Sequence, residues 1–205
     1  EVRVEYAADG KAISKLHATG GVTLANKTDA AEAKEAVYTI ATGTVVMTGD
    51  VLLTQGAARV VGVEVGHGQI HEKLKTDERV VVLENVNARE LDDSPLREHA
   101  PAEGFDLIVA DLSFIALSKI VPHLGPWLKP GGQALMLIKP QFEATRAEAD
   151  KAQGIIKDPV IHARVVDGLT ASIQSLPGAQ VLGVIPSPIE GRDGNKEFLI
   201  AVKRA

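Results

Sequence analysis

Residues 105–117, FDLIVADLSFIAL, and residues 129–143, KPGGQALMLIKPQFE, decide the fold of this chain. Each stretch holds an apolar run that ends in a charged residue, Asp111 in the first and Lys139 in the second. Continuous Val/Ile/Leu runs are typical of parallel strands that are buried on both faces. Open α/β sheets bind ligands beyond the carboxyl ends of such strands, which predicts a functional edge at these two residues. The alternative for either residue alone is a strand end that meets solvent.

Strands and helices alternate on both sides of this stretch, from Arg59 to the end of the chain. Asp158 followed by Pro159 is typical of a helix N-terminus. The alternation predicts an α/β fold with a doubly wound, mostly parallel sheet, closed by a hairpin-like antiparallel pair. Strands are predicted within residues 59–65, 79–92, 105–113, 131–142, 179–189 and 195–204, and helices within 70–77, 114–128 and 158–176. The last helix is predicted to pack through Ile161, Val165, Val166, Leu169 and Ile173.

Residues 1–56 follow another pattern, with Gly, Asp and Thr at short intervals between brief alternating runs. This spacing predicts a short β-meander. Residues 18–56, ATGGVTLANKTDAAEAKEAVYTIATGTVVMTGDVLLTQG, resemble the repeated β-jelly-roll of the LptA/OstA family of periplasmic lipopolysaccharide-transport proteins. The resemblance covers about residues 4–56 and implies a segment that binds lipopolysaccharide. The alternative is an antiparallel sheet without a ligand.

Composition excludes several classes of protein. The 205 residues are 45% hydrophobic, and none of the apolar runs approaches the roughly 18 residues of a membrane span, so a soluble protein without a signal peptide is expected. The absence of Cys excludes disulfides and Cys-based zinc sites. A net charge of −5 argues against a broadly basic nucleic-acid binder, and an aromatic content of 3% argues against base stacking on several rings.

Residues 57–205 resemble the TlyA-type hemolysins, which are FtsJ-like rRNA 2′-O-methyltransferases. The matching motifs, in order, are GAARVVGVEVGHGQ, VNAREL, DLIVADLSFI, LIKPQFE, GIIKDPVIHA and VIPSPIEGRDGNKEFL. The resemblance implies a cytoplasmic enzyme with a Rossmann-like sheet. Its implied cofactor is S-adenosylmethionine, and its implied substrate is rRNA or a ribosomal subunit. The chain is therefore divided into an LptA/OstA-like segment, 1–56, and a partial methyltransferase domain, 57–205.

The resemblance assigns the catalytic residues. Asp111, Lys139 and Glu197 match three members of the Lys–Asp–Lys–Glu tetrad of FtsJ-like enzymes. A ribose 2′-hydroxyl must lose its proton as it attacks a methyl group, and a lysine can serve as the base or orient the hydroxyl. Flanking carboxylates would hold the ammonium group. The alternatives are a salt-bridged strand-end lysine and a surface acid on a late strand.

The resemblance also assigns cofactor-binding residues. Glu64 ends its strand where the family places an acid that accepts hydrogen bonds from both ribose hydroxyls. Asn87 lies in the next turn, where it would read the adenine edge, and Asp111 would also face the cofactor. Asn is equally a common turn residue. His67 and His71 are four residues apart without a third ligand, so a metal site is not expected.

Residues 140–159 are polar and are predicted to form a flexible loop that covers the substrate. Arg146, Lys151 and Lys157 would meet phosphates there, or remain solvated charges.

The sequence departs from the family at the cofactor loop. Residues 42–56, TGTVVMTGDVLLTQG, lack the expected Asp-x-Gly loop, and Gly49 and Asp50 are its nearest remnants. The run GTVVMTG, 43–49, is hypothesised to fill the place of the missing central strand. The two resemblances meet at residues 50–60, which indicates a fusion, a recombination or an assembly artefact, and weak or absent activity is expected. Two alternatives stay open: a lipopolysaccharide-binding or bridging module with a passenger α/β domain, or an RNA-binding pseudo-enzyme.

Overall fold

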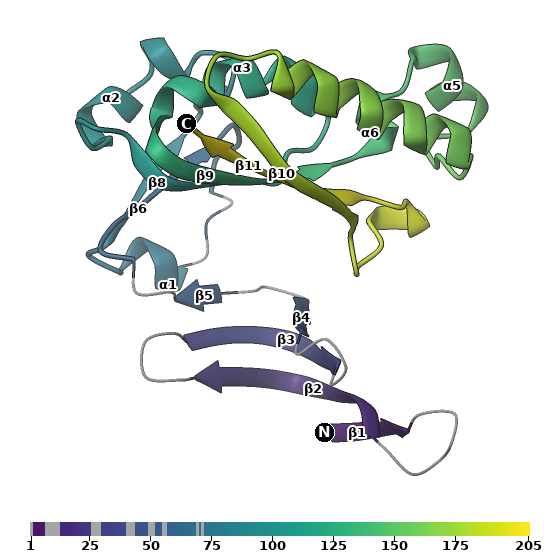
Figure 1. The fold of residues 1–205 in the computed structure, drawn as a ribbon. Coiled ribbons are helices and arrows are strands. Elements are labelled where there is room, and N and C mark those ends of the chain that lie inside the picture. The colour runs from purple at the N-terminus through teal and green to yellow at the C-terminus, as the bar shows by residue number, and fades with distance from the viewer. Residues whose placement is uncertain are drawn as a thin grey trace. The chain divides into compact units, whose positions relative to one another are not determined.

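The computed structural model describes residues 2–6, 13–25, 30–39, 44–48, 52–54, 57–68, 70 and 72–205, without the side chains of the first five ranges or of residues 72, 73 and 192. The chain divides into two compact units, Glu1–Val60 and Val61–Ala205 (Figure 1).

The described part of the first unit is an antiparallel sheet of five strands. Its strands are β1 Val2–Tyr6, β2 Ile13–Ala25, β3 Ala30–Thr39, β4 Thr44–Thr48 and β5 Leu52–Thr54. They follow the order β1-β2-β3-β4, and β5 also pairs with β3. The predicted β-meander is confirmed.

The hypothesis that residues 43–49 complete the central sheet of the second unit is wrong. Of these residues, Thr44–Thr48 form β4, which pairs with β3 from Thr44 opposite Thr39 to Thr48 opposite Glu35. An antiparallel partner that directly precedes a strand in the chain closes a short loop, whereas insertion into a distant sheet closes a long one. Residues 44–48 therefore pair with the preceding strand β3 and not with the sheet of the second unit.

The second unit contains two sheets. A two-stranded sheet joins β6, Val60–Glu64, to β7, Val80–Glu84. A four-stranded sheet has the order β10-β11-β9-β8. Its strands are β8 Phe105–Ala110, β9 Leu128–Ile138, β10 Ala179–Pro186 and β11 Phe198–Arg204. Within the described residues β8 is an edge strand, in agreement with the prediction of an incomplete central sheet.

The strand directions differ from the prediction of a mostly parallel sheet. In the four-stranded sheet only β8 and β9 are parallel, whereas β11 is antiparallel to both β9 and β10. The loop after β10 returns the chain directly, and the returning strand β11 inserts between β9 and β10. The hairpin thus contributes two antiparallel pairings instead of one.

Helix α6, Pro159–Gln174, packs against β10 and closes one face of the sheet (Figure 1). Its predicted start is confirmed, since the side chain of Asp158 accepts a hydrogen bond from the Val160 N–H at 2.8 Å. The core beneath it includes Ile138, Ile173 and Ile200, each 0% exposed. Burying an aliphatic side chain of this size contributes about 1.5–3 kcal/mol to folding.

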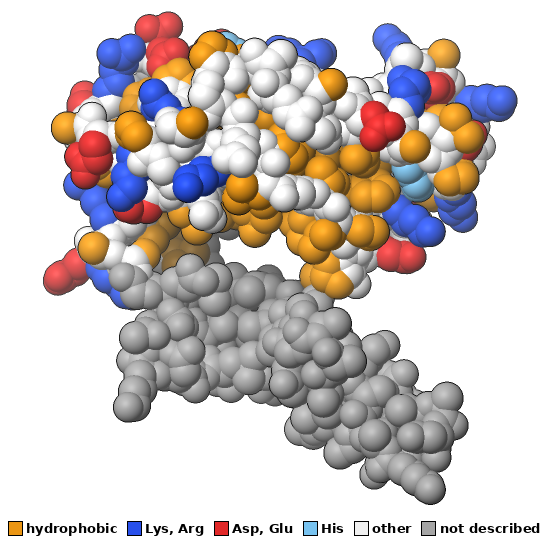
Figure 2. Space-filling model, viewed as in Figure 1, with side chains coloured by type: hydrophobic (Ala, Val, Ile, Leu, Met, Phe, Trp, Pro, Cys, Tyr) orange, Lys and Arg blue, Asp and Glu red, His pale blue; other side chains and the backbone are white. Residues whose placement is uncertain are grey.

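The other face of the sheet exposes aliphatic side chains, because neighbours along a strand point to opposite faces. Val109 is 67% exposed and its register partner Leu135 is 40% exposed. Leu182 and Ile185 on β10 are 50% and 59% exposed. Hydrophobic side chains gather over this part of the second unit in Figure 2.

The prediction of one continuous helix within residues 114–128 is wrong. The segment forms three short turns: η2 Leu117–Lys119, α3 Val121–Leu124 and η3 Gly125–Trp127. Pro122 and Pro126 each lie at the first positions of a new turn, because proline cannot donate the hydrogen bond that continues a helix.

The polar run predicted as a flexible loop is also helical. It forms α4, Pro140–Glu143, and α5, Arg146–Lys151. Helix α5 starts with a capping box between Thr145 and Glu148, a pattern that can be read from Thr-x-x-Glu in the sequence.

The remaining short elements connect these parts of the second unit. They are α1 Glu72–Lys75, η1 Leu91–Asp93, α2 Leu96–His99 and η4 Arg192–Gly194. Among the helices of the described residues, none is long and apolar enough to cross a membrane.

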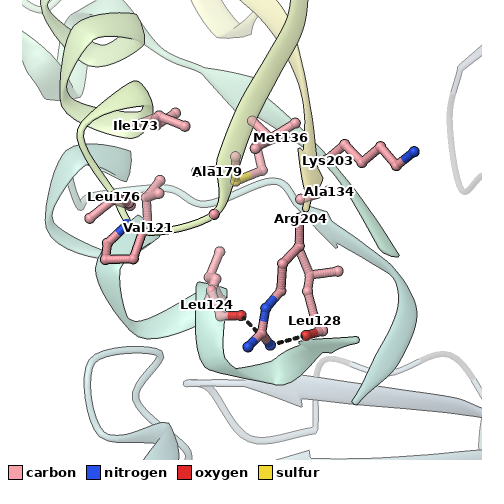
Figure 3. A pocket seen from close by; sticks show the side chains of 14 residues that line it. Val121, Leu124, Leu128, Ala134, Met136, Ile173, Leu176, Ala179, Lys203 and Arg204 are labelled. Atoms are coloured by element: carbon pink, nitrogen blue, oxygen red, sulfur yellow. Dashed lines mark hydrogen bonds between the residues drawn. The ribbon is translucent and has the colours of Figure 1, made fainter. Parts of the chain in front are cut away.

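A cavity of about 50 Å³ lies between β9, α6 and the start of β10 (Figure 3). Its walls are mainly aliphatic and include Ala134, Ile173 and Ala179. At its mouth Arg204 donates hydrogen bonds to the carbonyl oxygens of Gly125, at 3.3 Å, and of Leu128. We interpret the cavity as a packing defect, because its lining offers no acid, base or nucleophile directed inward.

Candidate active site

Lys139 and Asp111 meet at the carboxyl edge of the parallel strands. Asp111 directly follows β8 and Lys139 directly follows β9, and Ala110 pairs with Met136 near these ends. Nζ of Lys139 lies 2.7 Å from Oδ1 of Asp111. The lysine side chain is only 13% exposed, whereas the aspartate side chain is 66% exposed. The ammonium group therefore sits below a carboxylate that faces solvent.

The loop after β8 adds two side chains that the sequence did not single out. Nζ of Lys139 also donates to Oγ of Ser113 at 3.1 Å. Phe114 has a φ of 63° and is 89% exposed, with its ring 5.5 Å from that of Phe142. A bulky residue with positive φ is strained by about 1–3 kcal/mol, and such strain is concentrated at functional sites. An aromatic ring held open beside an ion pair can stack on a planar ligand.

Glu197 lies one layer below the ion pair. It is 7% exposed, and its Oε1 accepts a hydrogen bond from Nε2 of Gln141 at 2.9 Å. Strands β9 and β11 pair as far as Ile138 opposite Phe198, so Glu197 follows this register opposite Lys139. The structure thus places all three predicted catalytic residues at one sheet edge, but only Asp111 contacts Lys139 directly.

Glu64 and Asn87 lie at the ends of neighbouring strands, β6 and β7. The backbone N–H of Val86 donates to the Glu64 carbonyl at 3.0 Å, which brings the two ends together. Oε1 of Glu64 accepts from the N–H of Gly66 at 2.7 Å, and Oδ1 of Asn87 accepts from the N–H of Arg89 at 3.0 Å. Each side chain therefore stabilises its own turn.

These two residues fit the nucleoside end of a cofactor. The Glu64 bond to Gly66 uses Oε1 and leaves Oε2 as an acceptor for a hydroxyl, while Asn87 keeps its amide N–H groups as donors. Acceptor and donor on adjacent strand ends suit a ribose and a base. A loop for the methionine end is not assigned among the described residues.

The predicted phosphate-binding charges are spread along the surface. Arg146 lies 3.7 Å from Asp150 in a solvent-exposed pair, and Lys151 and Lys157 are exposed. Glu148 of α5 binds Arg164 at 2.6 Å, and the hydroxyl of Thr145 is the main cause of the lowered pKa of Glu148. These contacts stabilise α5, and they do not indicate a phosphate-binding site on it.

His67 pairs with Glu84 at 2.8 Å, whereas His71 lies outside the described residues. Within the part of the chain that the structure describes, His, Asp and Glu form no group suited to a metal ion.

Two family models match the chain. The FtsJ-like methyltransferase model matches residues 48–204, and the model of the LptA/(LptD N-terminal domain) LPS transport protein matches residues 1–73. The two matches overlap at the junction predicted within 50–60. Both resemblances inferred from the motifs are therefore confirmed.

The chain is also similar to individual proteins. The 16S/23S rRNA (cytidine-2′-O)-methyltransferase TlyA of Mycobacterium tuberculosis is 40% identical over 151 residues, which are 74% of this chain and 54% of that protein. Hemolysin A of Brachyspira hyodysenteriae is 37% identical over 150 residues, which are 73% of this chain and 60% of that protein. The chain thus spans little more than half the length of these curated relatives.

Two solved structures share the fold. A hemolysin-type protein from Streptococcus thermophilus and another from Lactococcus lactis are each 37% identical, with TM-scores of 0.65. Each comparison covers 74% of this chain, with 52% of the first protein and 69% of the second.

Proposed function

Because the chain belongs to the FtsJ-like methyltransferase family, we propose that its second unit transfers a methyl group to a ribose 2′-hydroxyl of ribosomal RNA. The observation that carries the proposal is the ion pair between Lys139 and Asp111 at the carboxyl edge of β8 and β9, 2.7 Å across. A cation and a carboxylate at one edge can orient a hydroxyl and accept its proton. An rRNA substrate implies a cytoplasmic protein.

Lys139 orients the 2′-hydroxyl in this proposal. Two of its three N–H groups donate hydrogen bonds to Asp111 and Ser113. The third N–H group is directed to the 2′-oxygen in this proposal. Because the lysine side chain has low exposure, the position of its ammonium group is fixed. The hydrogen bond from this group orients the 2′-oxygen, so that a lone pair of the oxygen points toward the methyl group. The O–C bond would form as the S–CH3 bond of the sulfonium donor breaks and leaves a neutral thioether, and the hydroxyl proton would pass to Oδ2 of Asp111, which faces solvent and can release it.

S-adenosylmethionine supplies the methyl group in this family of reactions. Glu64 would accept hydrogen bonds from its ribose hydroxyls through Oε2, and Asn87 would donate to the adenine edge. Both side chains lie at the carboxyl ends of neighbouring strands, as a nucleotide site in an open α/β sheet requires.

Phe114 would hold the target nucleotide. A ribose inside a folded RNA reaches an enzyme most easily when its base is turned out of the stack. The ring of Phe114 is exposed, and its backbone is strained by a positive φ. Because Phe114 directly follows Ser113, its ring places a stacking surface beside the reacting groups.

Calorimetry with S-adenosylmethionine and methyl transfer to purified rRNA test the proposal. Cofactor binding and 2′-O-methylated product are expected from the wild-type chain, both weakened because residues 42–56 lack the Asp-x-Gly loop. Glu64→Gln should weaken binding at least about tenfold, since a charged, partly buried acceptor for the ribose hydroxyls is replaced. Glu84→Gln is the matched control, because Glu84 ends β7 but binds Gly68 and His67. Absence of both cofactor binding and product would refute the proposal.

A second function is suggested for the first unit by the match of residues 1–73 to an LPS transport model and by its antiparallel sheet. We propose the first 56 residues as a separate module that binds lipopolysaccharide. Titration of the full chain with lipopolysaccharide, with S-adenosylmethionine present and absent, tests this function independently. Lipid binding that is absent in both titrations would contradict it.

A further inference from the structure

The carboxylate of Glu197 occupies a slot defined by two neighbours. On one side, Nε2 of Gln141 donates to its Oε1 at 2.9 Å. On the other side, a Cβ atom added at Gly191 would lie 2.2 Å from the same Oε1. A side chain at position 191 would therefore require the Glu197 carboxylate to move. The slot therefore fixes the carboxylate sterically and by hydrogen bonding.

The loop that carries Glu197 is itself anchored. Asn195 is 5% exposed, and its Oδ1 accepts from the N–H of Ile156 at 3.0 Å. Its Nδ2 donates to the carbonyl of Gly154 at 3.1 Å, and its own carbonyl accepts from the N–H of Gly191 at 2.7 Å. Because these partners come from two separate segments, the loop holds Glu197 in one position.

Gln141 is tied to Lys139 through the backbone. Lys139 precedes the first residue of α4, and its carbonyl accepts hydrogen bonds from the N–H of Phe142 at 2.9 Å and of Glu143 at 3.3 Å. Pro140, between Lys139 and Gln141, is buried. The lysine and the glutamine are thus parts of one compact turn, and a movement of one displaces the other.

The orientation of the Gln141 amide indicates which group it serves. Its Oε1 is buried and has no hydrogen-bond donor among the residues that the structure describes. An unpaired buried acceptor costs about 1–3 kcal/mol. The opposite orientation would direct the amide oxygen at Oε1 of Glu197 and place two acceptors in contact. In the observed orientation the amide N–H donates to the Glu197 carboxyl oxygen instead, so the Gln141 side chain serves Glu197.

We propose that Gln141 is a positioning residue for Lys139, acting through Glu197. It holds Glu197 at the register position opposite Lys139, so that the start of β11 adds a second acidic residue near the lysine, beside Asp111 from the end of β8. When Asp111 takes up the hydroxyl proton, Glu197 remains as the acidic neighbour that keeps the ammonium group in place. The catalytic consequence rests on the proposed methyl transfer, but the coupling of the three side chains does not.

Nuclear magnetic resonance tests the coupling without requiring activity. The side-chain amide signal of Gln141, identified by its loss in Gln141→Leu, is compared between the wild type, Lys139→Met and Lys129→Met. We expect the signal to move in Lys139→Met and to stay in place in Lys129→Met, whose lysine lies at the other end of β9. A signal that stays in place in both variants would overturn the proposal even if the wild type methylates RNA.

An exchange of the two side chains separates positioning from packing. Gln141→Glu alone opposes two carboxylates and should lower the melting temperature, whereas Gln141→Glu combined with Glu197→Gln restores an acid–amide pair. We expect the double variant to recover the melting temperature but to keep kcat at least about tenfold below the wild type, with KM for S-adenosylmethionine unchanged. Full recovery of kcat would show that the pair only packs and would overturn the proposal. A wild type without methyl transfer refutes the proposed function, while the amide signal still decides the coupling.

Discussion

Strands β8 and β9 carry a lysine–aspartate ion pair at each end. At the amino end Lys129 binds Asp106, and at the carboxyl end Lys139 binds Asp111. The lysine side chains differ in exposure, 37% for Lys129 and 13% for Lys139. The chemistry of the two pairs is the same, so any functional difference between them must come from their surroundings.

The carboxyl end is surrounded by groups that can act on a ligand. Ser113 binds the same lysine, Phe114 stands open beside it, and Glu197 follows the register opposite it. At the amino end Asp106 is 83% exposed, and Leu128, which precedes Lys129 in the chain, lines the aliphatic cavity. In an α/β sheet the carboxyl end holds the ligand site and the other end contributes to stability. The two pairs therefore offer matched variants that separate catalysis from folding.

The largest expected effect comes from the two lysines. Lys139→Ala should lower the single-turnover rate of methyl transfer at least about 100-fold, because the 2′-oxygen loses the group that orients it. Lys129→Ala should stay within about twofold of the wild type, because a solvated pair has no contact with substrate. Equal rates of methyl transfer in the two variants would show that the carboxyl and amino ends of β8 and β9 do not differ in function.

The two aspartates should differ in folding. Asp111→Asn leaves a largely buried ammonium group without its counter-ion and should lower the free energy of unfolding by about 1–3 kcal/mol in urea. Asp106→Asn should have a smaller effect on the free energy of unfolding, since both members of the Lys129–Asp106 pair are solvated. The reverse order would mean that the amino-end pair is the structural one.

Removal of the Phe114 ring tests the substrate side of the carboxyl end. Phe114→Gly should weaken rRNA binding about tenfold, since stacking of one base on an aromatic ring is worth about 1–3 kcal/mol. Its melting temperature should be maintained or raised, because glycine adopts positive φ without strain. Val109→Ala is the control, an exposed apolar residue within β8. Unchanged binding in a filter assay would exclude the ring from the RNA site.

Filling the cavity tests the amino end. Ala179→Val should raise the free energy of unfolding by at most about 1 kcal/mol, from about 24 cal/mol for each Å³ of the cavity. Methyl transfer should not change. Ala179→Ser, which adds no methyl group, should leave stability at or below the wild type. A change in activity from this filling would connect the two ends and contradict their separation.

The smallest expected effect is a pH dependence of the amino-end pair. The hydrogen bond from Lys129, aided by its charge, lowers the pKa of Asp106 below its ordinary value of 3.8. A lowered folded-state pKa stabilises the protein above the unfolded value, and this stabilisation is lost as the pH falls through the folded value. The difference in urea midpoint between wild type and Asp106→Asn should therefore be present at about pH 6 and be lost as the pH falls below 3.8 and through the lower folded-state pKa. A difference that persists at the lower pH would assign it to packing.

Local patterns in the sequence predicted what depends on neighbouring residues. The start of α6 at Asp158, its apolar face and the β-meander are all confirmed, because a cap, a helical period and a short turn involve residues close in the chain. The local bonds of Glu64 and Asn87 also involve neighbouring residues, since each side chain accepts from a backbone N–H two residues away, but their cofactor roles stay predictions. Pro122 and Thr145 also carried local signals, which would have corrected the helix within 114–128 and the loop at 140–159.

The family itself was also determined by the sequence, because six motifs in order identify it and the family model covers residues 48–204. Tertiary structure alone decided three features. It paired residues 44–48 with β3, inserted β11 beside β9, and directed Gln141 to a carboxylate 56 residues away. Each depends on which of several possible strand partners closes the chain at the lowest cost in entropy while burying the most apolar surface. Neither quantity can be read from a local window of sequence.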